Sequence, residues 1–97
     1  QEFEEKFAKT VGAKYAIAVC DCTVALELAL RSLKIERGDE VIVPDFTHPA
    51  TAQAVVWAGA DPVLVDEDPF SYNIDIDSIE KAITRKTKCV IPVSWGG

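Results

Sequence analysis

The chain has 97 residues, of which 48% are hydrophobic and 27% are charged. These proportions are typical of a globular protein, and the length suits one small domain or part of a larger one. The net charge of −6 argues against a protein that binds nucleic acid, because neutralising phosphates requires clustered Lys and Arg. No apolar run approaches the about 20 residues that span a bilayer, so we expect no membrane partner.

The cysteine content and the first residues indicate where the protein works. The chain has three cysteines, Cys20, Cys22 and Cys89. A secreted disulfide scaffold has more cysteines, usually in an even number. The stretch "QEFEEKFAK" is rich in charge and lacks the apolar region of a signal peptide. We therefore expect a reducing, cytoplasmic location. The sequence has no Met and stops directly after a predicted strand, so both ends are expected to be truncated.

Helices and strands are predicted to alternate along the whole chain. In chain order they are a helix over residues 1–12, a strand over 15–19, a helix over 23–34, a turn and then a strand over 38–44, a helix over 49–60, a strand over 61–66, a helix over 77–83 and a strand over 87–93. The strands are short, continuous apolar runs, which indicate a parallel sheet covered on both faces. The predicted fold class is therefore α/β, a parallel-type sheet covered by helices in three layers.

Two of the helices carry a further expectation. The helix over 23–34 has a single polar stripe, formed by Glu27, Arg31 and Lys34, so we expect it to be mostly buried. The helix over 77–83 begins with Asp77 three residues before Glu80, the spacing of a capping box.

The stretch Cys20–Thr23 lies between a predicted strand and a predicted helix, where open α/β sheets bind ligands. A zinc ion would need two further ligands, a disulfide between Cys20 and Cys22 would strain a tight turn, and a catalytic thiol would need a positioned base. The start of the helix favours instead a phosphate held by free backbone N–H groups and the Thr23 hydroxyl. Helix capping by Thr23 explains the same residues, and both interpretations stay open.

His48 is the only histidine and follows the carboxyl end of a predicted strand. A lone histidine is often a helix cap or a surface residue, but this place also suits a ligand contact through ring stacking or proton transfer. The acidic residues 66–68 are interpreted as turn chemistry in a solvated loop. The lysines lie on exposed helix faces or before strands, so we expect none of them to form a Schiff base. We predict no catalytic residue and no metal ligand in the chain.

Four stretches of the sequence resemble the sugar aminotransferases of the DegT/DnrJ/EryC1/StrS family. They are "FEEKFAKTVGAKYAIAVCDCTVALELALRSL", "GDEVIVPDFTHPATAQAVVWAGADPVLVDED", "YNIDIDSIEKAIT" and "KTKCVIPVSWGG". This family consists of pyridoxal-phosphate (PLP) enzymes with the aspartate-aminotransferase fold, fold type I. The resemblance covers essentially all 97 residues and implies that residues 1–97 are an early part of the large, PLP-binding domain.

The resemblance implies roles for individual residues. Cys22 and Thr23 fall in the family's turn, typically Ser-Ser-Gly-Thr, that holds the cofactor phosphate; Thr23 matches and Cys22 replaces a Gly or Ala. Asp21 would repel a phosphate unless its carboxylate points away. His48 falls where the family stacks an aromatic ring on the pyridine ring of PLP. Ser94–Gly96 replaces a His-Leu-Tyr-Gly-like stretch and should lie near the carboxyl edge of the sheet.

The resemblance also implies a reaction and partners. The parent protein would transfer an amino group, with glutamate as donor, to a keto group of a nucleotide-linked sugar, and would work as a cytoplasmic homodimer. The Schiff-base lysine has no counterpart in the chain, which alone is expected to be inactive. The alternatives are a non-catalytic α/β module derived from the same fold and a nucleotide-binding domain of another lineage. The second is disfavoured because the glycine-rich phosphate-binding motifs are absent.

Overall fold

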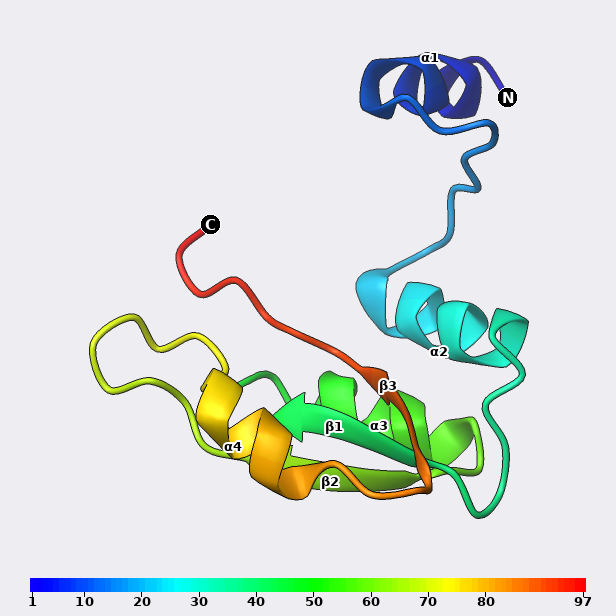
Figure 1. The fold of residues 1–97 in the computed structure, drawn as a ribbon. Coiled ribbons are helices and arrows are strands. Elements are labelled where there is room, and N and C mark those ends of the chain that lie inside the picture. Colours follow the sequence, from blue (N-terminus) through cyan, green and yellow to red (C-terminus); the bar gives the residue numbers. More distant parts are fainter.

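A computed structural model describes all 97 residues of the chain as four helices and a three-stranded sheet (Figure 1). In chain order the elements are α1 (Glu2–Val11), α2 (Cys22–Ser32), β1 (Glu40–Pro44), α3 (Ala50–Trp57), β2 (Asp61–Val65), α4 (Ile76–Ala82) and β3 (Thr87–Val90). The predicted α/β class is confirmed. The principal extents of 43, 34 and 22 Å reflect an extended shape, because α1 lies away from the sheet.

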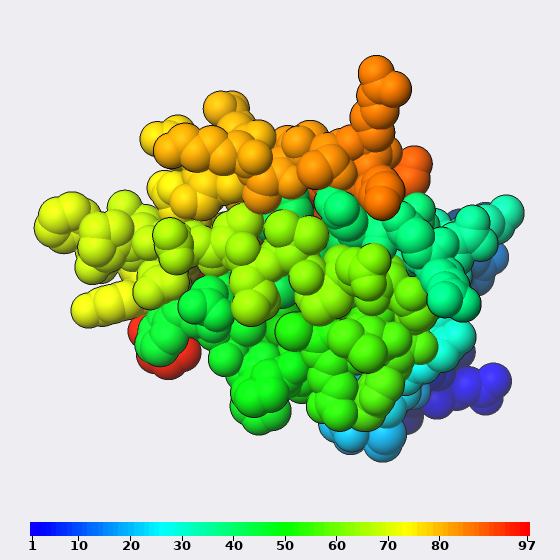
Figure 2. Space-filling model, turned by 90° about the horizontal axis from the view of Figure 1, so that it is seen from below, coloured from blue at the N-terminus to red at the C-terminus, as the bar shows by residue number.

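The sheet is parallel throughout, with the strand order β2-β1-β3. From β1 the chain moves to one side to form β2, and from β2 it returns across β1 to form β3. Because crossovers between parallel strands are right-handed, these opposite movements place α3 and α4 on opposite faces of the sheet. Figure 2 shows this from below, with α4 in yellow and orange on one side and α3 in green on the other.

The core forms where α2 and α3 pack onto the central strand. Val41 and Val43 of β1 point to the same face and are completely buried in a cluster of seven residues, whose other five members lie on α2, α3 and the connecting loops. The whole cluster is Leu30, Ile35, Val41, Val43, Ala54, Val55 and Ala60. Ile42 points to the opposite face, where α4 lies, and is also completely buried. The central strand is therefore the most buried element of the chain.

Helix α2 is less buried than its narrow polar stripe predicts. Only Leu30 is fully buried, while Leu28 and Leu33 are 49% and 63% exposed. The helix packs along one side against α3, and its other apolar side has no covering element within residues 1–97. The expectation that α2 is mostly buried is therefore wrong for these residues.

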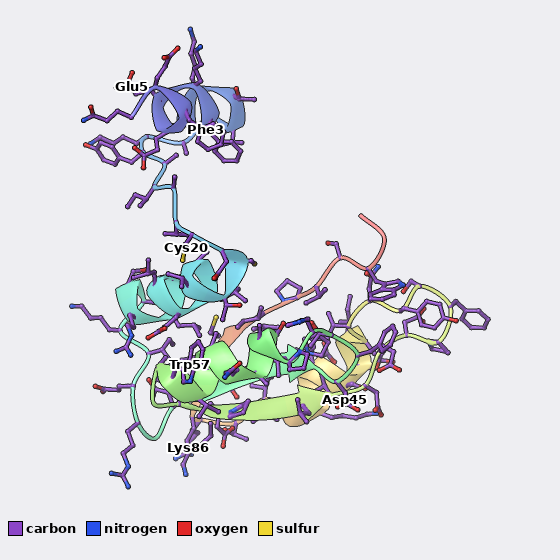
Figure 3. The ribbon with its side chains drawn as sticks, turned by 180° about the vertical axis from the view of Figure 1, so that it is seen from behind. Phe3, Glu5, Cys20, Asp45, Trp57 and Lys86 are labelled. Carbon is purple, nitrogen blue, oxygen red and sulfur yellow. The ribbon has the colours of Figure 1, made fainter.

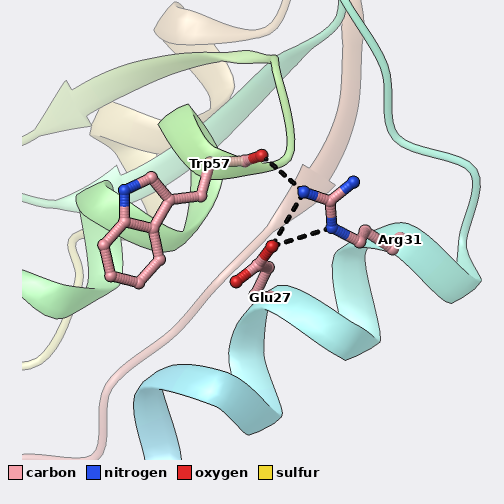
Figure 4. Close-up of polar contacts among 3 residues, drawn as sticks. All are labelled: Glu27, Arg31 and Trp57. Carbon is pink, nitrogen blue, oxygen red and sulfur yellow. Dashed lines mark hydrogen bonds and ion pairs between the residues drawn. The ribbon is translucent and has the colours of Figure 1, made fainter.

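A guanidinium group joins α2 to α3 (Figure 4). Arg31 donates through Nε to Glu27 Oε1 at 2.8 Å and through Nη2 to the carbonyl oxygen of Trp57 at 2.9 Å. Trp57 is the last residue of α3, so the positive group lies at the negative end of that helix. The polar stripe of α2 thus includes a bridge between helices.

Replacing Arg31 should loosen this bridge. In the full-length protein we expect Arg31→Met, which keeps the apolar stem but removes the donors, to lower the free energy of unfolding by about 0.5–1 kcal/mol, the range for partly exposed ion pairs. Urea unfolding measures the change, with Lys34→Met as the matched control on the same stripe. An equal loss in both variants would contradict the bridging role.

The predicted strand over residues 15–19 is not formed. This segment is extended but pairs with no strand, and Ile17 is 81% exposed. One of its backbone groups is held from α1, because Ala18 N donates to Glu4 Oε1 at 2.8 Å, and this bond holds the pKa of Glu4 below its ordinary value. A strand requires a neighbouring strand, and neither edge of the sheet lies beside this segment (Figure 1). The apolar pattern of this segment therefore predicted a strand, but the chain provides no strand with which it could pair.

The other elements occur where they were predicted, with shifted ends. The last strand stops at Val90 rather than residue 93, and α3 stops at Trp57 rather than residue 60. Helix α1 ends as expected at Gly12, which adopts a left-handed conformation with φ of 71°. Its predicted stripe is present, with the rings of Phe3 and Phe7 5.9 Å apart.

Candidate functional site

A cavity of about 390 Å³ lies at the carboxyl edge of the sheet. Its walls come from the start of α2, from the loop between β1 and α3, and from the chain after β3. The lining residues are Cys22, Leu26, Thr47, His48, Thr51, Ile91, Pro92, Val93 and Trp95. A larger hollow of about 460 Å³ lies along α1, but nearly all of its lining is apolar and no set of polar groups converges there. The cavity at the sheet edge is therefore the candidate site.

Two of the three predicted cofactor-binding residues line this cavity. Cys22 and His48 are 26 positions apart in the sequence, and the fold brings both onto its wall. Thr23 follows Cys22 in the first turn of α2 and is half-buried, but it is not among the lining residues. The predicted site residues thus gather at the end of the sheet where open α/β folds bind ligands. Their role in binding stays a prediction.

The first turn of α2 has free hydrogen-bond donors. The helix is capped by Asp21, whose Oδ1 accepts from the backbone N–H of Val24 at 2.8 Å. The backbone N–H groups of Cys22 and Thr23 find no acceptor in the chain, as is usual for the first residues of a helix. The interpretation of Thr23 as the helix cap is therefore wrong, because Asp21 takes that position.

The Asp21 carboxylate points toward the helix end rather than away from it. Its second oxygen lies 3.7 Å from the Cys20 sulfur. A phosphate at this helix start would meet two free N–H groups, the Thr23 hydroxyl and the positive end of the helix, all of which favour an anion. It would also meet one negative charge. The residues present therefore fit the phosphate group of PLP, with Asp21 as the single opposing group.

His48 is held in a defined orientation before α3. Its Nδ1 accepts from the backbone N–H of Ala50 at 3.1 Å, and its carbonyl oxygen accepts from Thr51 N at 3.0 Å. An accepting ring nitrogen carries no proton, so the neutral imidazole has its proton on Nε2. Thr47 supports the same loop through a 2.9 Å hydrogen bond between its hydroxyl and that of Thr51. The exposed ring of His48 is therefore fixed by the backbone and presents Nε2 and its face for contact.

The thiols and the lysines complete the description of the site. Cys20 and Cys22 are exposed and unpaired, and the intervening Asp21 is fully extended, with φ of −160° and ψ of 172°. No group of three or more His, Cys, Asp and Glu side chains is placed to hold a metal ion. Figure 3 shows Lys86 and Asp45 at opposite ends of the sheet, so this lysine lies away from the carboxyl edge. No lysine lines the cavity.

Carboxylates stabilise the acidic loop after β2 by accepting hydrogen bonds within it, in agreement with the interpretation of this loop as a turn. Asp68 Oδ1 accepts hydrogen bonds from Phe70 N, Ser71 N and Ser71 Oγ, and the Ser71 bonds hold the pKa of Asp68 below its ordinary value. Asp75 caps α4 by accepting from Ser78 N at 2.8 Å. The predicted capping box beginning at Asp77 is therefore wrong, and the cap lies two residues earlier.

The cap of α4 should make the stability of this region depend on pH. The hydrogen bonds from Ser78 lower the pKa of Asp75, so its stabilising effect is present above the unfolded pKa of about 3.9 and is lost as the pH falls through the lower folded value. We expect wild type to exceed Asp75→Asn in stability at pH 7 and the difference to vanish near pH 2. Thermal unfolding across this pH range measures it, and a constant difference would contradict the assignment.

Sequence reasoning missed an aromatic cluster beside the cavity. Phe46, Tyr72 and Trp95 follow the three strands β1, β2 and β3, and the Phe46 ring lies 5.8 Å from that of Tyr72 and 4.7 Å from that of Trp95. The sequence contains a signal for this cluster, because each of the three loops that follow the strands carries an aromatic residue. Parallel strands bring those loops together.

The fold and this site define a class of protein. A parallel α/β sheet with helices on both faces is the arrangement of the PLP-dependent aminotransferases of fold type I, to which the structural neighbours belong. One is a putative sugar aminotransferase, Spr1654 from Streptococcus pneumoniae in its PMP form, with a TM-score of 0.90 and 40% identity over 94% of this chain and 23% of that chain.

The chain belongs to the DegT/DnrJ/EryC1/StrS aminotransferase family, which it matches over residues 1–97. It is 50% identical to GDP-perosamine synthase of Caulobacter vibrioides and 49% identical to UDP-2-acetamido-2-deoxy-3-oxo-D-glucuronate aminotransferase of Pseudomonas aeruginosa. Each match covers 99% of this chain and, respectively, 26% and 27% of the relative. The chain thus spans about a quarter of the length of these relatives. The predicted resemblance and the fold type are confirmed. None of its helices is long and apolar enough to cross a membrane.

Proposed function

We propose that these residues form part of the PLP-binding large domain of an aminotransferase that aminates a keto group on a nucleotide-linked sugar, with glutamate as the amino donor. The observation that carries the proposal is the cavity that joins the free helix start at Cys22 to the fixed ring of His48. The names of the two relatives, a GDP-sugar synthase and a UDP-sugar aminotransferase, support the substrate class. A homodimer and a cytoplasmic location belong to the same proposal, and the three free cysteines suit a reducing compartment.

The chain's own residues would bind and orient the cofactor. PLP, when bound, supplies an electron sink and carries the amino group between the two halves of the reaction. The N–H groups of Cys22 and Thr23 and the Thr23 hydroxyl would hold its phosphate, and His48 would stack on its ring. The apolar wall formed by Ile91, Pro92 and Val93 would exclude water. No lysine lines the cavity, so the proposal assigns the Schiff-base lysine to a part of the protein outside residues 1–97.

The test uses the full-length protein. The apoenzyme should bind PLP in an absorbance titration and should transaminate a nucleotide-linked keto sugar with glutamate. Thr23→Val, which preserves shape but removes the hydroxyl, should weaken PLP binding about tenfold, the value of about 1.4 kcal/mol expected for one hydrogen bond to a charged group. Ser32→Ala, at the far end of the same helix, is the matched control. Unchanged PLP affinity in Thr23→Val would contradict the phosphate site.

One observation favours a second candidate, a non-catalytic module that has lost its cofactor. Asp21 directs a carboxylate at the helix start where the phosphate would lie. If the full-length protein fails to bind PLP at micromolar concentration and gains binding only in Asp21→Asn, the non-catalytic module is favoured. If the 97-residue chain alone formed a borohydride-reducible adduct with PLP and turned over, the need for residues outside it would be wrong.

A further inference from the structure

Trp95 is the aromatic residue with the largest ring in the cavity wall. It follows β3, and its side chain lines the same cavity as Cys22 and His48. The side chain is 52% exposed, so a large aromatic surface remains available beside the residues proposed to hold the cofactor. Aromatic walls with a few fixed polar groups are typical of sites that bind small molecules.

Two neighbouring loops position Trp95, one by a hydrogen bond to its backbone and the other by packing against its indole. The backbone N–H of Trp95 donates to Asn73 Oδ1 at 2.9 Å, a contact between residues 22 positions apart. The Trp95 ring centroid lies 4.7 Å from that of Phe46 with an angle of 47° between the rings. Such tilted packing is a favourable aromatic arrangement. The indole is therefore a positioned group rather than a freely rotating surface side chain.

The loop that supplies Asn73 is strained at the residue before it. Tyr72 has a positive φ of 59°, a conformation that bulky residues rarely adopt. Two backbone bonds impose it, because Tyr72 N donates to Asp68 O at 2.9 Å and Asp68 N donates to Asn73 O at 2.8 Å. Strain of this kind persists where the surroundings over-determine it and is concentrated at functional sites. Here the strained residue directly precedes Asn73, whose side chain accepts from Trp95 N.

From this arrangement we infer that Trp95 is a substrate-binding residue whose indole packs against the C–H face of the hexose ring of the substrate, and that Asn73 positions it. The inference rests on the proposed function. In that reaction the keto carbon must lie beside the cofactor, so the part of the substrate that reaches the shared cavity is the sugar rather than the charged nucleotide. A hexose has an apolar C–H face that suits an exposed indole, and its binding there would remove water from both surfaces.

The experiment compares substrates in the full-length enzyme loaded with PLP. Trp95→Ala should raise KM for the nucleotide-linked keto sugar about tenfold or more, with unchanged KM for glutamate and unchanged affinity for PLP. Trp95→Phe should recover most of the loss. Asn73→Ala should raise the same KM severalfold, and Asn73→Asp, which keeps the acceptor oxygen, should restore it. Phe70→Ala is the matched control, because Phe70 is 91% exposed on the same loop.

A binding measurement separates the sugar from the nucleotide. By calorimetry on the apoenzyme, Trp95→Ala should weaken binding of the nucleotide-linked sugar and leave binding of the free nucleoside diphosphate unchanged. Equal weakening of both ligands, an unchanged KM for the sugar, or a lower affinity for PLP would each overturn the inference while leaving the proposed function in place. Absence of transamination by the wild-type enzyme would overturn the proposed function and this inference with it.

Discussion

Ile42→Ala should lower the free energy of unfolding of the protein by about 2–5 kcal/mol, the range for removing most of a buried aliphatic side chain. Ile42 lies in the middle of the central strand, is completely buried, and is paired with Val63 on one side and Val90 on the other. Its side chain lies on the sheet face that α4 covers, opposite the cluster around Val43. The truncation leaves a cavity, which the surrounding residues cannot close because β1 is hydrogen-bonded to β2 and to β3 on its two sides.

The measurement is urea unfolding of the full-length protein, followed by tryptophan fluorescence. Arg37→Ala is the control, because this exposed side chain makes no hydrogen bond or ion pair in the structure, and it should change the stability by less than about 0.5 kcal/mol. Ile42→Val should fall between the two, at about 1 kcal/mol. A loss below about 1 kcal/mol for Ile42→Ala would show that the second face of the sheet is not a packed core.

The second large effect is a gain in cofactor affinity rather than a loss of stability. Asp21→Asn should strengthen PLP binding by the full-length apoenzyme about tenfold. The carboxylate accepts from Val24 N at the helix start, so its charge lies where the cofactor phosphate is proposed to bind. Two like charges at one helix start repel each other, and salt reduces the repulsion. Asn keeps the oxygen that caps the helix but removes the charge.

An absorbance titration with PLP at two salt concentrations measures this effect. The difference between wild type and Asp21→Asn should shrink at high salt, because screening weakens the repulsion. Asp21→Ala is the control that separates charge from capping, since it should also lose about 1 kcal/mol of stability. Equal PLP affinity in wild type and Asp21→Asn at low salt would mean that the phosphate does not bind at this helix start.

Local pattern predicted most elements because each one carries its own signal. Helix α1 repeats its apolar residues at Phe3, Phe7 and Val11, and β1 is a continuous apolar run. The pattern failed for residues 15–19, where apolar character is present but pairing is not. Strand formation depends on a neighbour that is distant in the sequence, and no local signal reports whether that neighbour is in place.

The candidate site was likewise predicted only in part from the sequence. The sequence pointed to Cys22 and His48 separately, because each follows a predicted strand, and the parallel topology then places them on one cavity. It did not predict that Asp21 caps α2 or that Asn73 contacts Trp95. The first depends on the rotamer of one side chain, and the second joins two loops that only the order of the strands brings together.

By itself, therefore, the sequence determined the α/β class, the aminotransferase family and the residues Cys22, Thr23 and His48 as candidates. The class follows from short-range hydrophobic periodicity, whereas the family and the cofactor roles of these residues are what the resemblance of four sequence stretches implied. Only the tertiary structure decided where the Asp21 charge points, which aromatic rings meet at Phe46, and that no strand pairs with residues 15–19. The first depends on the rotamer of one side chain within a helix cap. The other two depend on side chains or backbones far apart in the chain, whose meeting is set by packing and by strand order rather than by local sequence.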